Sequence, residues 1–199
     1  QAFFPGEEGG RAVADVLTGA ATPSGRLPVS LPRTAGAQPY RYLQPVLGGP
    51  SDVTSTDPTP VRPFGFGLSY TTFATTDLEV DAEAPTDGVL TVGVTVENTG
   101  DVAGATVVQL YGHDVVASLS RPVAQLLAFA RVELAAGERG RVTMRVPAAR
   151  FAFTGRDMRR GVEPGTVEVW VADHAGASAP KALEDTTGGA IVSSAVNRR

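Results

Sequence analysis

The fold is decided by residues 89–111, whose sequence is VLTVGVTVENTGDVAGATVVQLY. Apolar side chains occupy every second position from Leu90 to Val96, which is typical of a β-strand with one buried face. The run Asn98-Thr99-Gly100-Asp101 that follows is a turn signal. Residues 107–111, VVQLY, are apolar enough to form a second strand that is buried on both faces.

The same period of two continues toward the C-terminus. Apolar residues alternate with polar ones at 142–146 and again at 167–171, and residues 126–134 and 150–154 are consistent with two further strands. About seven short strands with a turn roughly every ten residues are typical of an immunoglobulin-like β-sandwich. We therefore expect a mainly β fold, with the sandwich extending over residues 75–172.

The first 33 residues have a different pattern, of the α/β type. Carboxylates at Glu7 and Glu8 suit the positive end of a helix, and Gly19 is placed to end that helix in a left-handed cap. Leu, Val and Leu at alternate positions of 27–31, next to prolines, indicate an edge strand. One helix and one strand cannot bury their own apolar faces, so we expect residues 1–33 to pack against a larger α/β structure.

Two connecting segments surround the predicted sandwich. Residues 34–63 are rich in Pro, Gly, Ser, Thr and Asp, and the next ten residues bring together Phe64, Phe66 and Tyr70. We interpret residues 34–74 as a linker that ends in an aromatic packing segment, because exposed rings would form an apolar patch that needs a cover. Residues 173–199 are mostly small and polar, and we expect a tail with at most one extra edge strand.

Composition excludes several classes of function. The chain has 199 residues, a formal net charge of −4 and no basic patch that would neutralise phosphates, which argues against nucleic acid as a partner. No apolar run approaches the roughly 20 residues that cross a bilayer. Cysteine is absent, and His113 and His174 lie in no metal-binding motif, so we expect neither metal nor cofactor. Any signal peptide would precede Gln1, which leaves a cytoplasmic or a secreted location open.

Taken in order, these segments resemble the C-terminal part of glycoside hydrolase family 3, the family of many β-glucosidases and β-xylosidases. The matching segments are residues 5–19, 23–32, 63–73, 98–100, 107–111, 121–122, 134–138 and 163–165. The resemblance implies a (β/α)8-type barrel, then an α/β sandwich, then a fibronectin type III-like β-sandwich. Residues 1–33 would be the C-terminal remnant of the α/β domain, and residues 75–172 the fibronectin-like domain.

The resemblance also implies that this segment lacks the catalytic carboxyl groups. Hydrolysis with retention needs two carboxyl groups about 5–5.5 Å apart, and the family places its nucleophilic Asp on the barrel and its acid/base Glu on an earlier loop of the α/β domain. We therefore expect no catalytic residue here and an inactive isolated chain. The implied partners are the N-terminal barrel and α/β domains, in the same polypeptide or on a separate chain, and an oligosaccharide or glycoside substrate.

A few residues remain as candidates for a binding site. Tyr40 and Tyr42 lie on the long linker and are the rings best placed to contact a sugar in an intact enzyme. Trp170 alternates with valines, so it is either a residue of the sandwich face or a contact for a partner. Glu7 and Glu8 are adjacent in sequence and point about 100° apart on a helix, so we expect them to interact with free backbone N–H groups rather than to face one sugar together. An edge position in an active site is the alternative for one of them.

Two classes of function fit these observations. The first is the C-terminal, stabilising part of a retaining β-glucosidase-like hydrolase. The second is a non-enzymatic fibronectin-like module that binds carbohydrate or protein, which fold alone does not exclude. Residues 1–33 would serve no purpose in a free-standing module, so the sequence favours the first.

Overall fold

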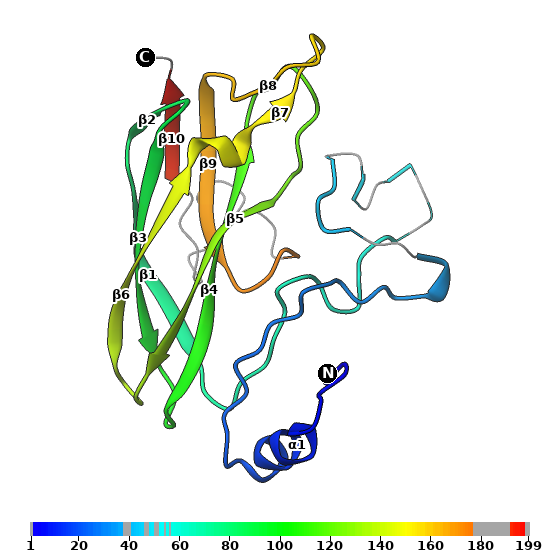
Figure 1. The fold of residues 1–199 in the computed structure, drawn as a ribbon, viewed down its shortest axis with the longest axis vertical. Coiled ribbons are helices and arrows are strands. Elements are labelled where there is room, and N and C mark those ends of the chain that lie inside the picture. Colours follow the sequence, from blue (N-terminus) through cyan, green and yellow to red (C-terminus); the bar gives the residue numbers. More distant parts are fainter. Residues whose placement is uncertain are drawn as a thin grey trace.

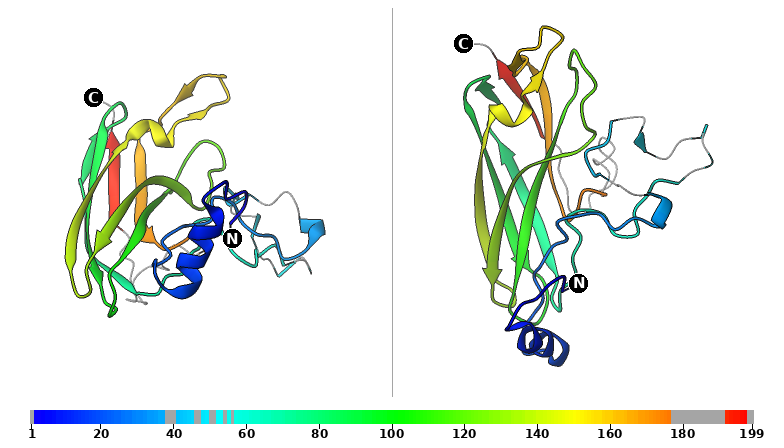
Figure 2. Two further views of the ribbon diagram at one scale, coloured as in Figure 1. Left: turned by 60° about the horizontal axis from the view of Figure 1, so that its bottom comes forward. Right: turned by 45° about the vertical axis from the view of Figure 1, so that its right-hand side comes forward.

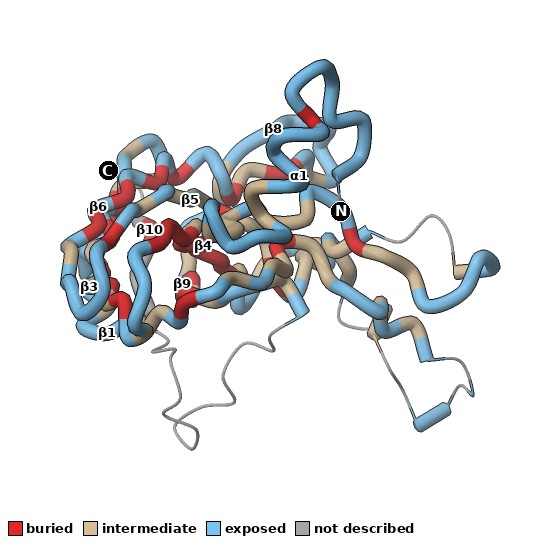
Figure 3. Tube along the Cα trace, turned by 90° about the horizontal axis from the view of Figure 1, so that it is seen from below, coloured by how far each residue is buried: buried red, intermediate tan, exposed pale blue. Residues whose placement is uncertain are grey.

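The structure is a computed structural model that describes residues 2–37, 41–45, 48–49, 52–53, 55, 57–176 and 192–197. Its body is a β-sandwich, and one α-helix and a long connection with a short 3₁₀ helix (Ala35–Ala37) lie outside the two sheets (Figure 1). Figure 3 shows that buried residues concentrate in the strands, whereas the N-terminal segment and the connection are mostly exposed or half-buried. The expected mainly β sandwich is therefore confirmed.

The sandwich consists of two sheets and a small hairpin. The three-stranded sheet has the order β1-β3-β6 and contains β1 (Phe73–Val80), β3 (Val89–Asn98) and β6 (Arg139–Pro147). The five-stranded sheet has the order β2-β10-β9-β4-β5 and contains β2 (Glu83–Pro85), β10 (Val192–Asn197), β9 (Gly165–Ala172), β4 (Gly104–Asp114) and β5 (Gln125–Leu134). A 3₁₀ helix (Ala148–Phe151) leads into the hairpin of β7 (Phe153–Thr154) and β8 (Arg160–Gly161).

The core lies between the two sheets and follows the predicted alternation. On β3, the residues at every second position from Leu90 to Val96 are fully buried, and the first three of them pair with Val146, Met144 and Val142 of β6. Val108 and Leu110 of β4 face the same core. Burial of apolar area contributes about 25 cal/mol per Å², so these inward faces provide the main drive for folding.

The turn after β3 is organised by one buried amide. Asn98 Nδ2 donates to the carbonyls of Val102 (2.8 Å) and Leu134 (3.2 Å). Asn98 Oδ1 accepts from Thr71 Oγ1 (2.6 Å) and from the N–H of Gly100 (3.1 Å). The turn predicted at this position is confirmed, and its amide closes one end of the sandwich with all its polar atoms bonded.

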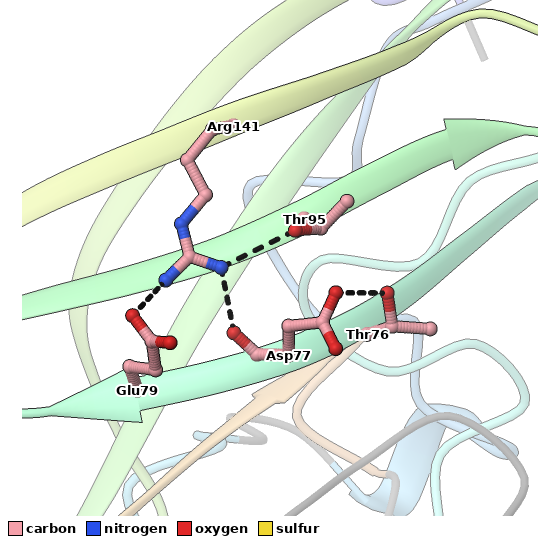
Figure 4. A network of polar contacts seen from close by, with 5 residues as sticks. All are labelled: Thr76, Asp77, Glu79, Thr95 and Arg141. Carbon is pink, nitrogen blue, oxygen red and sulfur yellow. Dashed lines mark hydrogen bonds and ion pairs between the residues drawn. The ribbon is translucent and has the colours of Figure 1, made fainter.

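A β-bulge interrupts β1 and is held by an arginine from β6 (Figure 4). The register with β3 shifts between Thr76 and Glu79, and Asp77 has a φ of 52°. Arg141 Nη1 donates to the carbonyl of Asp77 (2.8 Å) and to Thr95 Oγ1 (3.2 Å), while Nη2 bonds the carboxylate of Glu79. One side chain therefore joins all three strands of this sheet.

The helix forms as expected. It is α1 (Gly9–Thr18), and Gly19 ends it in the left-handed region with φ 79° and ψ 6°, donating its N–H to the carbonyl of Val16. Thus the predicted glycine cap is confirmed.

Three strand predictions need correction. Residues 27–31 form no strand and make a single isolated bridge, between Leu31 and Arg62, because the neighbouring prolines lack the N–H groups that a ladder requires. The extra strand of the tail exists as β10, but it is not an edge strand: it pairs with β2 on one side and with β9 on the other. Of residues 150–154, expected to be one strand, 150 and 151 end the 3₁₀ helix and only 153 and 154 are in a strand, β7.

Candidate functional site

The candidate site is the place where the linker lies on the outer face of the five-stranded sheet. Residues 25–31 run beside residues 61–67, with the N–H of Leu27 donating to the Phe66 carbonyl (2.9 Å) and the N–H of Gly65 donating to the Leu27 carbonyl (2.8 Å). The turn 173–176 after β9 also contacts this segment. We call residues 61–67, Gln109 and Tyr111 of β4, and the turn 173–176 together the linker junction (Figure 2).

A buried amide lies at the centre of the linker junction. Gln109 of β4 is 3% exposed, and its Nε2 donates to the backbone carbonyls of Gly65 (3.0 Å) and Asp173 (2.7 Å). Its Oε1 accepts from the hydroxyl of Tyr111 (2.8 Å). A polar residue inside an apolar strand must find partners when it is buried, and this one finds all of them in the linker, the turn and its own strand.

Gly65 is required by this arrangement. Its φ is +83°, and a Cβ added there would lie 2.1 Å from Oε1 of Gln109. A larger residue would be strained by its backbone conformation and would also displace the amide. Sequence reasoning did not single out Gln109 or Gly65; the signal was a lone amide in the otherwise apolar run at 107–111.

Aromatic rings surround the amide. Tyr111 and Trp170 are fully buried and lie 6.3 Å apart between ring centroids. Burial raises the pKa of Tyr111 well above its ordinary value, so the phenol stays protonated and remains a hydrogen-bond donor. Trp170 is thus a residue of the sandwich face that the linker covers.

Tyr42, a predicted sugar contact, is half-buried in this cluster. Its ring stacks on Phe64 at 4.3 Å and an angle of 10°, and its hydroxyl accepts from the N–H of Leu126 at 3.4 Å. The same stretch is tied to the β4–β5 loop, since the N–H of Val123 donates to the carbonyl of Gln44 (2.9 Å). Tyr40, the other predicted sugar contact, lies outside the described residues.

The carboxylates at the helix start do not act as expected. Glu8 is the N-cap residue of α1, but its side chain makes no capping hydrogen bond, and both Glu7 and Glu8 are exposed. Glu8 has φ −81° and ψ 3°, outside the extended region that capping residues use, and the N–H of Gly9 bonds the Gly6 carbonyl instead. The expected interaction of these carboxylates with backbone N–H groups was wrong for Glu8.

The helix α1 carries exposed apolar side chains. Tyr70 Oη donates to the Val16 carbonyl (2.7 Å), which fixes the helix to the end of the linker. Beside this contact, Leu17 is 78% exposed and Leu68 is 74% exposed, and Val13 is also exposed. Several large apolar side chains at one end of the chain are typical of a surface that another structure covers.

The linker junction is suited to holding segments together rather than to hydrolysis. Its polar side chains include an amide, a phenol, an imidazole and a guanidinium, and its one carboxylate side chain is that of Asp173. Retaining glycoside hydrolysis needs two carboxyl groups. Within the part of the chain that the structure describes, no three or more His, Cys, Asp or Glu side chains are grouped to hold a metal ion. Of the helices described, none has the length and apolar character needed to cross a membrane.

Comparison with known proteins matches both halves of the chain. Residues 1–70 match the family model of the glycosyl hydrolase family 3 C-terminal domain, and residues 106–175 match that of the fibronectin type III-like domain. The periplasmic beta-glucosidase of Salmonella typhimurium is 41% identical over 184 residues, which cover 86% of this chain and 24% of that protein. A beta-xylosidase of Formosa agariphila is 37% identical over 175 residues, covering 86% and 24% respectively.

Solved structures of beta-glucosidases are similar to this chain in fold as well. The beta-glucosidase from Listeria innocua in complex with glucose superposes with a TM-score of 0.84 at 34% identity, and the match covers 98% of this chain and 27% of that one. A beta-glucosidase involved in saponin metabolism from intestinal bacteria superposes with a TM-score of 0.83 at 32% identity. The chain therefore spans about a quarter of the length of the relatives that it matches.

Proposed function

Because this chain belongs to glycoside hydrolase family 3 and corresponds to the C-terminal region of such an enzyme, we propose that it is the stabilising part of a β-glucosidase-type hydrolase. Residues 1–33 complete the α/β domain, residues 34–74 link the two domains, residues 75–172 form most of the fibronectin-like sandwich, and the tail, residues 173–199, adds β10 to its five-stranded sheet. The nucleophile and the acid/base belong to the part of the enzyme that precedes this region.

One observation carries this proposal: a segment that matches a family 3 C-terminal domain leads into a two-sheet sandwich, while apolar side chains on α1 are exposed. Leu17 of α1 is exposed, and so is Leu68. Fully burying such a side chain contributes about 1.5–3 kcal/mol. We propose that the preceding part of the α/β domain covers this surface and that the sandwich, through the linker junction, keeps α1 in position for it.

The reaction that we propose is hydrolysis of terminal β-linked sugars from oligosaccharides or glycosides with retention of configuration. A fragment without both carboxyl groups cannot stabilise the transition state. We therefore propose that the isolated chain is inactive. The named β-glucosidase and β-xylosidase relatives support this class of substrate.

A chimera tests the proposal. The last quarter of the Listeria innocua beta-glucosidase would be replaced by this chain, and hydrolysis of an aryl β-glucoside and an aryl β-xyloside would be compared among the chimera, the truncated Listeria enzyme and this chain alone. We expect turnover by the chimera only. Turnover by this chain alone, at a rate comparable to that of the intact relative, would overturn the proposal.

Tyr40 and Tyr42 are proposed as residues that contact substrate in the intact enzyme. Tyr42 is held in a fixed orientation by its stack on Phe64, which supports a defined position for the linker around it. In the chimera, Tyr40→Ala and Tyr42→Ala should each raise KM, whereas Phe129→Ala, at an exposed ring of β5 outside the linker, should not. An unchanged KM in both variants would remove these residues from the site.

The non-enzymatic alternative has weaker support. A carbohydrate-binding face is commonly built from exposed aromatic rings, and the single Trp of the sequence, Trp170, is 1% exposed. Saturable binding of a saccharide to this chain at micromolar concentration, followed by calorimetry, would favour the module over the enzyme part.

A further inference from the structure

The turn after β9 is in direct contact with the linker. The N–H of Ala175 donates to the Phe64 carbonyl at 2.9 Å, and Gln109 bonds one carbonyl from the turn and one from the linker. A Cβ at Gly176 would lie 3.0 Å from the ring of Pro63, so backbone and ring are already close. The position of the linker on the sheet therefore depends on the conformation of residues 173–176.

His174 contacts both the backbone of that turn and the linker. Its Nδ1 accepts a hydrogen bond from the N–H of Gly176 at 3.2 Å, and its ring lies 5.8 Å from the ring of Phe66 at an angle of 44°. The acceptor role of Nδ1 requires a neutral imidazole that carries its proton on Nε2. A protonated imidazole has N–H groups at both nitrogens, so Nδ1–H would then face the N–H of Gly176, donor against donor.

We propose that His174 is an acid-sensitive latch, in which the neutral imidazole holds residues 63–66 on the sheet and protonation of the imidazole releases them. In the released state the hydrogen bond between Ala175 and Phe64 is broken, and the linker no longer covers Trp170. This inference concerns the linker junction of the chain itself and does not depend on the proposed hydrolase activity.

The charges that face His174 come from every segment around it. Burial, which is the largest effect, lowers the pKa of His174; the carboxylate of Asp173 raises it, and the guanidinium of Arg26 lowers it. On the linker, the Arg62 guanidinium lies over the Phe66 ring, 4.9 Å from its centroid. That ring would attract an imidazolium, as Asp173 does, but the net direction of the pKa is downward, so the docked linker favours neutral His174.

The sign of the pH dependence follows from that direction. Undocked His174 has an ordinary pKa of about 6.5, so between this value and the lower pKa of the docked state the undocked chain binds more protons. In that window the ratio of docked to undocked linker falls by up to about tenfold for each pH unit of acidification. Above this window the ratio of docked to undocked linker has its highest value and no longer changes with pH. Below the pKa of the docked state the ratio does not fall further.

Quenching of Trp170 by acrylamide tests the latch, because the chain has a single Trp and the linker covers it. The chain has only two histidines, so the variants His174→Asn and His113→Asn separate their effects. The amide oxygen that His174→Asn introduces can still accept from the N–H of Gly176, but the amide takes up no proton. Between pH 7.5 and 4.5 we expect quenching to rise severalfold in the wild type and in His113→Asn, and to stay constant in His174→Asn.

A second measurement covers the case in which His174→Asn does not fold. The imidazole of His174 in the wild type is titrated by NMR, and the protection factor of the Ala175 amide against hydrogen exchange is followed over the same pH range, because this N–H donates to the Phe64 carbonyl in the docked state. The latch requires the two curves to share a midpoint below the ordinary value for histidine. Separate midpoints, an equal rise of quenching in His174→Asn, or no rise in the wild type would overturn it.

Discussion

The hydroxyl of Tyr111 donates a hydrogen bond to the amide oxygen of Gln109 at 2.8 Å, and this contact orients the centre of the linker junction. With its oxygen occupied, the amide directs its nitrogen to Gly65 and to Asp173, which lie 44 and 64 residues away in the sequence. Residues from the linker and from the tail are thus positioned by one side chain of a central strand. A structural role of the sandwich in the whole enzyme would act through this amide.

Removal of the Tyr111 hydroxyl tests this relationship. Tyr111→Phe leaves a buried amide oxygen without its donor, and we expect it to lower the free energy of unfolding by about 1–2 kcal/mol. Gln109→Leu leaves two carbonyls and a hydroxyl without partners and should cost about 3 kcal/mol. Urea unfolding measures both values.

The matched control is Tyr70→Phe. The hydroxyl of Tyr70 also donates to a carbonyl, that of Val16, but the side chain is exposed and water can replace it. We expect a change below about 0.5 kcal/mol. Equal effects at Tyr70 and Tyr111 would show that the buried network contributes nothing beyond an ordinary surface hydrogen bond.

Gly65→Ala separates backbone strain from steric conflict with Gln109. A positive φ alone costs a non-glycine residue about 1 kcal/mol, and Gly137→Ala measures this cost because Gly137 has φ +73° and open space around its Cα. At Gly65 the added Cβ would also displace the amide oxygen of Gln109. We expect Gly65→Ala to cost about 2–4 kcal/mol in urea unfolding, and a cost equal to that of Gly137→Ala would contradict the steric argument.

Local patterns predicted the parts of the fold that depend on local sequence. The period of two in β3, β6 and β9, and the left-handed glycine after α1, follow from alternation and backbone freedom, and the structure has them. Residues 27–31 alternate as a strand would, yet their prolines leave only one bridge to Arg62. The pairing of β10 with β2 joins segments more than a hundred residues apart, and no local pattern indicates it.

The candidate site was predictable in part. A glutamine within the apolar run at 107–111 indicates that buried polar partners exist, but the sequence does not say that they are the carbonyls of Gly65 and Asp173. Likewise, the ring of Tyr42 was recognisable as a candidate for stacking, and its stacking partner within the chain, Phe64, became known only from the structure. Hydrogen-bond and stacking partners that are distant in the sequence are determined by the topology of the fold. The alternation of apolar and polar residues does not encode that topology.

Asp114→Asn should stabilise the chain at neutral pH. Burial raises the pKa of Asp114, an effect that the nearby Arg121 guanidinium partly offsets. The folded chain therefore binds a proton more readily than the unfolded chain, and stability is lost as the pH rises through the raised pKa. We expect a higher Tm for Asp114→Asn at pH 7 and an equal Tm at pH 3, by calorimetry. A lower Tm at pH 7 would show that the charge of Asp114 is needed by Arg121.

Glu163→Gln should behave in the opposite way. The carboxylate accepts from Ser118 Oγ (2.6 Å) and from the N–H of Ser118 (2.9 Å), and these bonds lower the pKa of Glu163. Its contribution is present above the ordinary pKa and is lost as the pH falls through the lowered value. Glu163→Gln should therefore lower Tm at pH 7, with the difference from the wild type disappearing at strongly acid pH. A Tm difference that persists there would point to loss of packing rather than of charge.

Arg141→Lys tests whether one guanidinium holds the bulge in β1. A lysine has no planar fork, so it cannot bond the carbonyl of Asp77 and the carboxylate of Glu79 together. We expect a loss of about 1 kcal/mol and faster amide exchange confined to β1. Gly93→Ala should have the same effect without changing Arg141 itself. A Cβ at position 93 would lie 2.5 Å from Nη2 of Arg141 and would displace the guanidinium. Arg145→Lys, on the same strand and face, is the matched control: exchange in β1 that is equally fast in this variant would mean that the bulge depends on the charge of the sheet face and not on the fork of Arg141.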